Sequence, residues 1–307
     1  MRIWFVGGGA FAASCLSHMS RNLTFEKILT GMPTKAGRGL KDQLSCVEKT
    51  ALGLGLPCER VDRLSRDEGI LEILAANPPD LVFVVDFAQL IREPLLNAPR
   101  WGCLNIHPSL LPRWRGAAPV QRALMNGDKT SGVTVFRLVE EMDAGPILVQ
   151  REVPLSVATT AEELFETLAL AGSQIAFYGV ESLISGSYQF LDQNSEFATY
   201  AVKISKAETQ TSWSQDNLRV HNTVRALNFS TGAFVLVGNK RLKLWKTLPV
   251  EGEGTPGEIL RFSEGNPVVA CRRGALLLLE VQSEGKRKVG GAEWACGNRL
   301  QTGEVLT

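Results

Sequence analysis

The chain begins with the apolar run Ile3-Trp-Phe-Val6, followed at once by Gly7-Gly-Gly9-Ala-Phe-Ala12. The run is typical of a buried strand, and the glycines predict a tight turn into a helix over residues 10–20. Apolar runs and helical patterns keep alternating after it, which predicts an α/β domain with a mainly parallel sheet. Further strands are expected at 27–30, 80–85, 103–106, 132–139 and 146–153, and further helices at 41–54, 66–76, 117–125 and 160–184.

The alternation of strand and helix patterns ends near residue 206. After one expected helix come five short β-prone runs separated by glycine and charged residues, which predict a small all-β barrel. We therefore expect a first domain at 1–188, a polar linker at 189–205 and a second domain at 206–307. The helix is expected at 213–227, and the runs at 233–237, 242–247, 257–262, 267–271 and 275–281.

Composition narrows the class of protein. The net charge is +1 and the mean hydropathy is zero, as in a soluble globular protein. No apolar run approaches the roughly 20 residues of a membrane span, and the glycine-broken start is too short for a signal peptide. The six cysteines are scattered and form no Cys-x-x-Cys pair, which favours neither a zinc knuckle nor a disulfide framework. We expect a cytoplasmic protein with reduced thiols and no metal.

The glycine turn also fits the dinucleotide pattern G-x-G-x-x-A. Such a site needs an acidic residue after the second strand to bind a ribose. That strand ends Thr30-Gly-Met-Pro33, and the next acidic residue is Asp42. A plain strand-to-helix turn is the favoured interpretation, and a nicotinamide oxidoreductase stays open as an alternative.

Three polar residues form a candidate catalytic set. Asn105 and His107 are two positions apart in the strand expected at 103–106 and the turn after it, so their side chains share one face. An amide can donate to a developing oxyanion, and an imidazole can do the same or move a proton. Asp143, in the turn Met142-Asp-Ala-Gly-Pro146, could orient the imidazole if the turn folds back on it. A structural histidine and an ordinary turn aspartate are the alternatives.

Basic residues gather in three places. Arg113 and Arg115 flank a tryptophan, residues 35–41 form a basic glycine-containing loop, and residues 240–246 alternate basic with apolar side chains. The alternation predicts a strand with one basic face, which on a small barrel suits nucleic acid. A solvated surface is the alternative in each case.

The run Asn105-Ile-His-Pro-Ser-Leu-Leu-Pro-Arg-Trp-Arg-Gly-Ala-Ala-Pro119, followed by Met142-Asp-Ala-Gly-Pro146, resembles the methionyl-tRNA formyltransferase family. The resemblance covers nearly the whole chain, including Tyr200–Lys206 at the expected domain junction. It implies a Rossmann-like formyltransferase domain and a C-terminal OB-type β-barrel domain. It also implies transfer of a formyl group from 10-formyltetrahydrofolate to the α-amine of methionyl initiator tRNA, for translation initiation. A monomer without a metal is expected.

The resemblance also assigns site residues. Asn105, His107 and Asp143 match the catalytic positions of the family. Folate contacts are implied at Ser109, Leu110, Leu111 and Pro112, and after the strand at 80–85 at Phe87, Ala88 and Leu90. Contacts with tRNA are implied at Lys35, Arg38, Lys41, Arg113, Arg115, Lys203, Lys206, Lys243 and Lys286.

Some positions depart from the family pattern. The first turn reads Gly7-Gly-Gly-Ala-Phe11 where Gly-Thr-Pro-x-Phe is usual, and Asp86-Phe-Ala88 stands where Ala-Tyr-Gly is usual. Asp86 adds a carboxylate beside the expected folate contacts. Two alternatives therefore stay open: a formyltransferase for a sugar-nucleotide amine, and a nucleic-acid-binding protein whose folate site has decayed.

Overall fold

The computed structural model describes residues 1–36 and 41–306, and the chain divides into two compact units. The first unit comprises Met1–Gly116, Thr130–Pro154 and Phe165–Tyr200, and the second comprises Ala117–Lys129, Leu155–Leu164 and Ala201–Thr307. The chain therefore enters the second unit twice before its C-terminal part. Among the described residues, no helix is long and apolar enough to cross a membrane.

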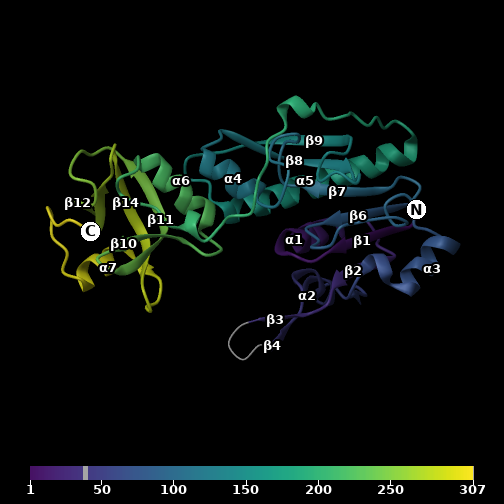
Figure 1. Cartoon of the computed structure of the whole chain (residues 1–307), viewed down its shortest axis with the longest axis horizontal. Coiled ribbons are helices and arrows are strands. Elements are labelled where there is room, and N and C mark those ends of the chain that lie inside the picture. The colour runs from purple at the N-terminus through teal and green to yellow at the C-terminus, as the bar shows by residue number, and fades with distance from the viewer. Residues whose placement is uncertain (37–40, 307) are drawn as a thin grey trace. The chain divides into compact units, whose positions relative to one another are not determined.

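The first unit is built on a seven-stranded sheet (Figure 1). The first five strands in the sheet order pair in parallel, and the last two strands are added by antiparallel pairing. This confirms the mainly parallel sheet expected from the alternating pattern. In sheet order the strands are β5 (Glu59–Val61), β2 (Lys27–Gly31), β1 (Ile3–Gly7), β6 (Leu81–Val85), β7 (Cys103–His107), β8 (Thr130–Arg137) and β9 (Ile147–Pro154).

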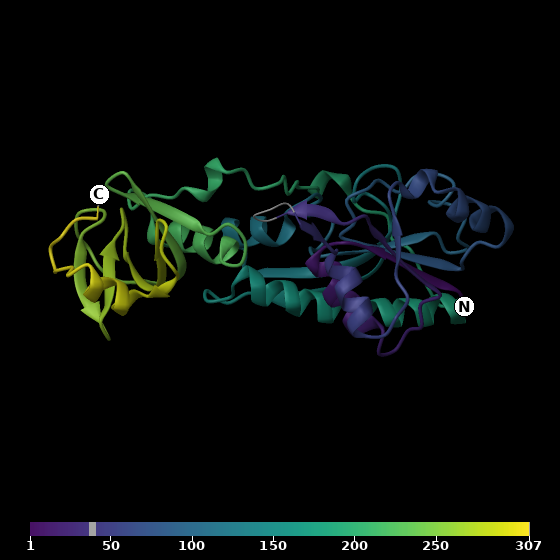
Figure 2. The same cartoon turned by 90° about the horizontal axis from the view of Figure 1, so that it is seen from below.

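Helices cover both faces of this sheet. On one face lies α5 (Ala161–Ser185), the long teal helix in Figure 2, where Gly172 lets it approach the side chains of Ile106 and Val133. Helix α1 (Ala10–Met19) lies beside it, because the Ser173 hydroxyl donates to the Cys15 carbonyl. On the other face, α3 (Glu68–Ala76) packs into an apolar cluster that includes Cys103. Side chains alternate along a strand, so Asn105 and His107 point to this second face, with Cys103.

One helix of the first unit starts several residues later than expected. The helix expected at 41–54 is α2 (Cys46–Gly53), because the Ser45 hydroxyl caps it by accepting a hydrogen bond from the Glu48 N–H at 2.9 Å. The residues before it form β4 (Lys41–Gln43), paired with β3 (Thr34–Ala36). Helix α5 begins at a capping box, in which the Thr160 N–H donates to Glu163 Oε2 and the Glu163 N–H donates to Thr160 Oγ1.

The second unit has an antiparallel sheet in the order β10-β11-β14-β13-β12, with β15 on β14. All five expected runs are strands. They are β10 (Ala233–Val237), β11 (Lys240–Val250), β12 (Ile259–Ser263), β13 (Asn266–Ala270) and β14 (Ala275–Ser283); β15 is Val289–Gly290. Helix α6 (Asn217–Leu227) packs on β11 and on α4 (Pro119–Asn126). It starts four residues later than expected, because Trp213 and Gln215 accept backbone hydrogen bonds from Arg272 instead. A short helix that the sequence analysis missed, α7 (Gly291–Gly297), follows β15.

Candidate active site

The candidate site lies at the C-terminal end of β7. Asn105 pairs with Val84 on β6 and with Phe136 on β8, and His107 pairs with Thr134 on β8. Asn105 is half-buried, and within the described part of the chain its side-chain amide has no hydrogen-bond partner. A rigid central strand therefore fixes two polar side chains on one face, with the amide available to a ligand.

The His107 ring is buried and oriented. Its Nε2 lies 2.9 Å from the carbonyl oxygen of Trp114, and a carbonyl can only accept, so Nε2 carries a hydrogen. Its Nδ1 lies 3.8 Å from Oδ2 of Asp143. That separation suits an ion pair but is too long for a hydrogen bond. Nε2 therefore contacts the Trp114 carbonyl, and Nδ1 is the ring nitrogen that faces the Asp143 carboxylate.

Asp143 reaches His107 from the loop between β8 and β9. Its backbone is left-handed, with φ of 53°, a conformation that Asp tolerates better than most residues. Its Oδ2 accepts a hydrogen bond from the Gly116 N–H at 2.8 Å. At Gly145 a Cβ would lie 1.8 Å from the Arg137 carbonyl oxygen, so the loop needs glycine there. The structure thus brings His107 and Asp143 together, and their catalytic roles stay a prediction.

The loop after His107 is tied to the sheet. The Ser109 hydroxyl is buried and donates to the Arg113 carbonyl at 2.7 Å, and Thr134 Oγ1 donates to the Ser109 carbonyl at 2.7 Å. Gln150 Nε2 donates to the carbonyl of Leu111, which is also buried. Ser109 and Leu111 therefore shape the loop from inside, while Leu110 and Pro112 are half-buried and more accessible.

The residues after β6 lie next to this loop, because β6 and β7 are neighbouring parallel strands. Phe87 is half-buried at the rim of the apolar cluster, and Ala88 and Leu90 are exposed. Gln89, which the sequence analysis did not single out, fixes the segment: it accepts from the Leu64 N–H and donates to the Asp62 carbonyl.

Asp86 turns toward the glycine turn of β1. Its carbonyl accepts from the N–H groups of Gly8 and Gly9, both at 3.2 Å, and a Cβ on Gly9 would lie 1.8 Å from its Oδ2. Much of the residue is exposed, but its carboxylate is enclosed where it accepts from the Phe11 backbone. Desolvation raises the pKa of the Asp86 carboxyl, and this hydrogen bond offsets part of the rise. The turn holds the chain's own carboxylate where a dinucleotide would place a phosphate.

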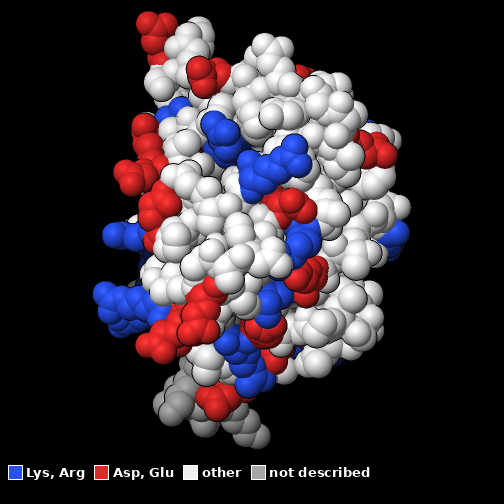
Figure 3. All heavy atoms as spheres, turned by 90° about the vertical axis from the view of Figure 1, so that its right-hand side faces the viewer, with Lys and Arg blue, Asp and Glu red and all other residues white. Residues whose placement is uncertain are grey.

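The basic residues of the first unit have different environments. Arg38 lies outside the described residues, and for Lys35 and Lys41 the structure describes only the backbone. Arg113 is exposed, with its guanidinium 5.8 Å from the Trp114 ring centre. Arg115 is only 1% exposed, so it does not present its charge to a surface-bound tRNA as the sequence analysis expected. On the face shown in Figure 3, basic and acidic side chains are interspersed.

The second unit carries the other basic residues. Lys203, Lys206 and Lys286 are exposed, and Lys243 donates to the Thr231 carbonyl at 2.7 Å. Lys286 lines a hollow of about 530 Å³, whose other members include Lys240, Arg241, Arg287 and Trp294. Trp294 is buried there, with its Nε1 donating to the Ser283 hydroxyl, and Glu284 and Glu293 also line the hollow, so its lining carries both signs of charge.

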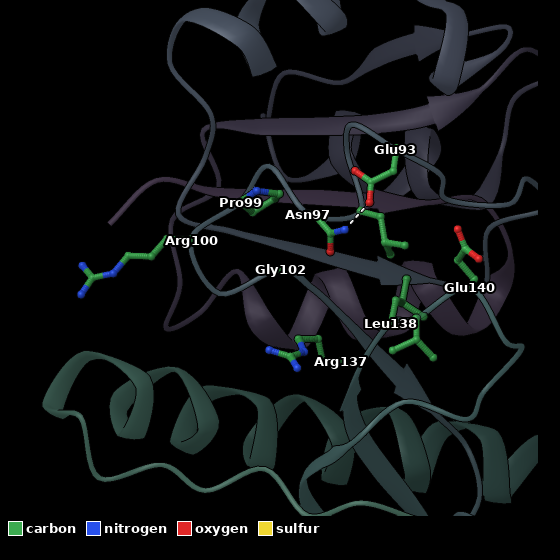
Figure 4. A pocket seen from close by; sticks show the side chains of 10 residues that line it. Glu93, Asn97, Pro99, Arg100, Gly102, Arg137, Leu138 and Glu140 are labelled. Atoms are coloured by element: carbon green, nitrogen blue, oxygen red, sulfur yellow. Dashed lines mark hydrogen bonds between the residues drawn. The ribbon is translucent and has the colours of Figure 1, made fainter.

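A separate hollow of about 440 Å³ lies at the other end of β7, where the strand begins. It is lined by Gly102, Arg137, Glu93 and Glu140, among others, and Glu93 is hydrogen-bonded to Asn97 (Figure 4). None of the three candidate catalytic residues lines it, so this hollow is not the candidate site. No group of three or more His, Cys, Asp or Glu side chains could hold a metal among the residues that the structure describes.

Comparison with known proteins identifies the family. Residues 1–178 match the formyl transferase family, and residues 203–299 match the formyl transferase C-terminal domain. The chain belongs to the formyltransferase family.

Relatives of similar length extend this result. The chain is 37% identical over 305 residues to a methionyl-tRNA formyltransferase of Aromatoleum aromaticum, covering 99% of this chain and 96% of that protein. It is 36% identical to the methionyl-tRNA formyltransferase of Paracoccus denitrificans, covering 98% of each. Among solved structures, the sugar 3N-formyltransferase WlaRD superposes with a TM-score of 0.66 at 21% identity, covering 94% of this chain and 99% of that one. HypX from Aquifex aeolicus, in complex with tetrahydrofolic acid, superposes with a TM-score of 0.67 at 18% identity. The match covers 96% of this chain and 47% of that one. The two structures show the shared fold.

Proposed function

We propose that this protein transfers a formyl group from 10-formyltetrahydrofolate to the α-amine of methionyl initiator tRNA. The observation that carries the proposal is the meeting of His107 and Asp143 beside the Asn105 amide at the end of β7. Similarity along the full length to methionyl-tRNA formyltransferases supports this acceptor. A monomer in the cytoplasm is part of the proposal.

The proposed reaction is direct transfer. The amine nitrogen attacks the formyl carbon, the carbon–nitrogen bond to the folate then breaks, and the proton that the amine loses balances the one that the folate nitrogen gains. The Asn105 amide and the Nδ1–H of protonated His107 donate to the oxyanion that forms on the formyl oxygen. Trp114 keeps the ring in place through Nε2. Asp143 balances the charge of the imidazolium and accepts the amine proton, directly or through water.

The segments that flank Asn105 suit a folate. Residues 87–90 and 109–112 follow neighbouring parallel strands, so both lie at the same edge of the sheet. Phe87, Leu90, Leu110 and Pro112 offer apolar surface there, while buried Ser109 and Leu111 hold the loop in shape. Apolar walls with a few placed polar groups are usual for such ligands.

For the tRNA, we propose that the second unit is an OB-type domain that binds the nucleic acid. The bulges in long β11, near Trp245, support a curved sheet of that kind. Lys203, Lys206, Lys243 and Lys286 are its proposed phosphate contacts, with Arg113 from the first unit. Lys35, Arg38 and Lys41 remain proposed contacts on sequence grounds.

The decisive experiment offers two acceptors to the purified protein with 10-formyltetrahydrofolate: methionyl initiator tRNA and an amino-sugar nucleotide. We expect formylmethionyl-tRNA, and a loss of at least about 10²-fold in rate for Asn105→Ala and for His107→Ala. Formylation of the sugar alone would establish the alternative enzyme. Folate binding without either product would contradict both, and near-normal turnover of either variant would refute the role of that residue.

A further inference from the structure

The position of Asp143 depends on a side chain distant from it in sequence. Nε2 of Gln193 donates to the carbonyl oxygens of Asp143 at 2.8 Å and Gly145 at 2.7 Å. These two carbonyls flank the turn that aims the carboxylate at His107. Gln193 comes from the segment after α5, which an isolated bridge joins to β9 between Leu191 and Ile147.

The amide of Gln193 has only one possible orientation. Its Oε1 accepts from Nε of Arg115 at 3.1 Å and from Nη2 at 2.9 Å. A guanidinium only donates, so the oxygen of the amide must face Arg115 and its NH₂ must face the two carbonyls. Arg115 therefore selects the orientation in which Gln193 can hold the turn.

Arg115 itself is fixed by burial. Its side chain is 2% exposed, and its carboxylate partner, Glu141 at 3.3 Å, is 71% exposed. Its backbone N–H donates to the Thr199 carbonyl, which ties it to the segment that carries Gln193. A buried cation with so exposed an ion partner depends on the neutral acceptor Gln193 for its other hydrogen bonds.

We propose that Gln193, oriented by Arg115, is a positioning residue that holds the Asp143 carboxylate at its working distance from His107. The proposal rests on the proposed function, because it concerns the same site. It also reassigns Arg115 from a tRNA contact to a support of the catalytic carboxylate. All four residues lie in the first unit.

Gln193→Glu tests the geometry with little change of shape. The new carboxylate still accepts from Arg115, but it places an oxygen where Nε2 now donates to two carbonyls. We expect the turn to move, kcat to fall by about 10²-fold, and KM for both substrates to change little. Gln174→Glu is the matched control, because Gln174 also accepts from an arginine, Arg151, but lies exposed on α5. It should leave kcat unchanged.

A double-mutant cycle separates positioning from general loss of stability. If Gln193 acts through Asp143, Gln193→Glu should cost little once Asp143→Asn is present. Gln193→Met, which keeps the length without the repulsion, serves instead if the Glu variant melts well below the wild type. Wild-type-like kcat in Gln193 variants, or a loss that simply adds to that of Asp143→Asn, would overturn the proposal. Failure of the proposed function would look different, because the wild type itself would then form no formylmethionyl-tRNA.

Discussion

The substitution Asp143→Asn isolates the charge of the carboxylate. Asparagine has nearly the same shape, tolerates the left-handed backbone at this position and can still accept the hydrogen bond from the Gly116 N–H. The turn held by Gln193 should therefore stay in place. What disappears is the negative charge 3.8 Å from Nδ1 of His107.

The size of the loss follows from that distance. Two unit charges 3.8 Å apart attract by about 4 kcal/mol at an effective dielectric constant of about 20. Solvent screens this pair little, because the side chains of His107 and Asp143 are only 7% and 13% exposed. If the imidazolium forms in the transition state, losing this attraction should lower kcat/KM by about 10³-fold.

The assay is formylation of methionyl-tRNA by the wild type and the variant under single-turnover conditions, together with thermal unfolding of both. We expect the rate to fall by about 10³-fold while the melting temperature changes by only a few degrees. A rate within tenfold of the wild type would refute the reasoning, since the carboxylate would then have no charge-dependent role.

Three further predictions follow from other contacts. Gly145→Ala should destabilise the first unit by about 1–3 kcal/mol, measured by urea unfolding, because its Cβ would lie 1.8 Å from the Arg137 carbonyl oxygen; unchanged stability would show that the loop yields freely. Lys286→Ala should weaken tRNA binding and reduce the slope of log affinity against log salt by about one, whereas Arg261→Ala, on strand β12 at one end of the sheet order, should not. Burial lowers the pKa of His221, which as the neutral ring donates to the Val157 carbonyl and accepts from a threonine hydroxyl. The unfolded chain therefore binds more protons below pH 6.5, so wild-type stability should fall from pH 6.5 downward and His221→Gln should flatten that fall; equal slopes would contradict it.

The sequence could predict those parts of this site that depend on the regular alternation of side chains along one strand. Two-residue spacing placed Asn105 and His107 on one face of a strand, and that follows from the pleat alone. The meeting with Asp143 needed the loop between β8 and β9 to fold back, which the family resemblance suggested and no local pattern could establish. Gln193 had no signal of its own, because it stands in a polar stretch that was interpreted as a linker. Arg115 was misleading because a charged side chain usually predicts a surface position. Its burial depends on Gln193, a partner 78 residues away in the sequence.

The course of the chain through the sheet explains why the site lies at β7. In an open α/β sheet, ligands usually bind where neighbouring strands lead away in opposite directions, here between β1 and β6. At that point Asp86 already occupies the N-terminal turn of α1, through the Phe11 backbone and the N–H groups of Gly8 and Gly9. An added phosphate would meet a carboxylate there, so the usual position is unsuited to an anion. One strand further along, β7 meets antiparallel β8, and the loop of the β8–β9 hairpin delivers Asp143 to the end of the strand that carries Asn105 and His107. The shift of the candidate site by one strand therefore follows from two features of the chain, a filled glycine turn and a hairpin in place of a further parallel crossover.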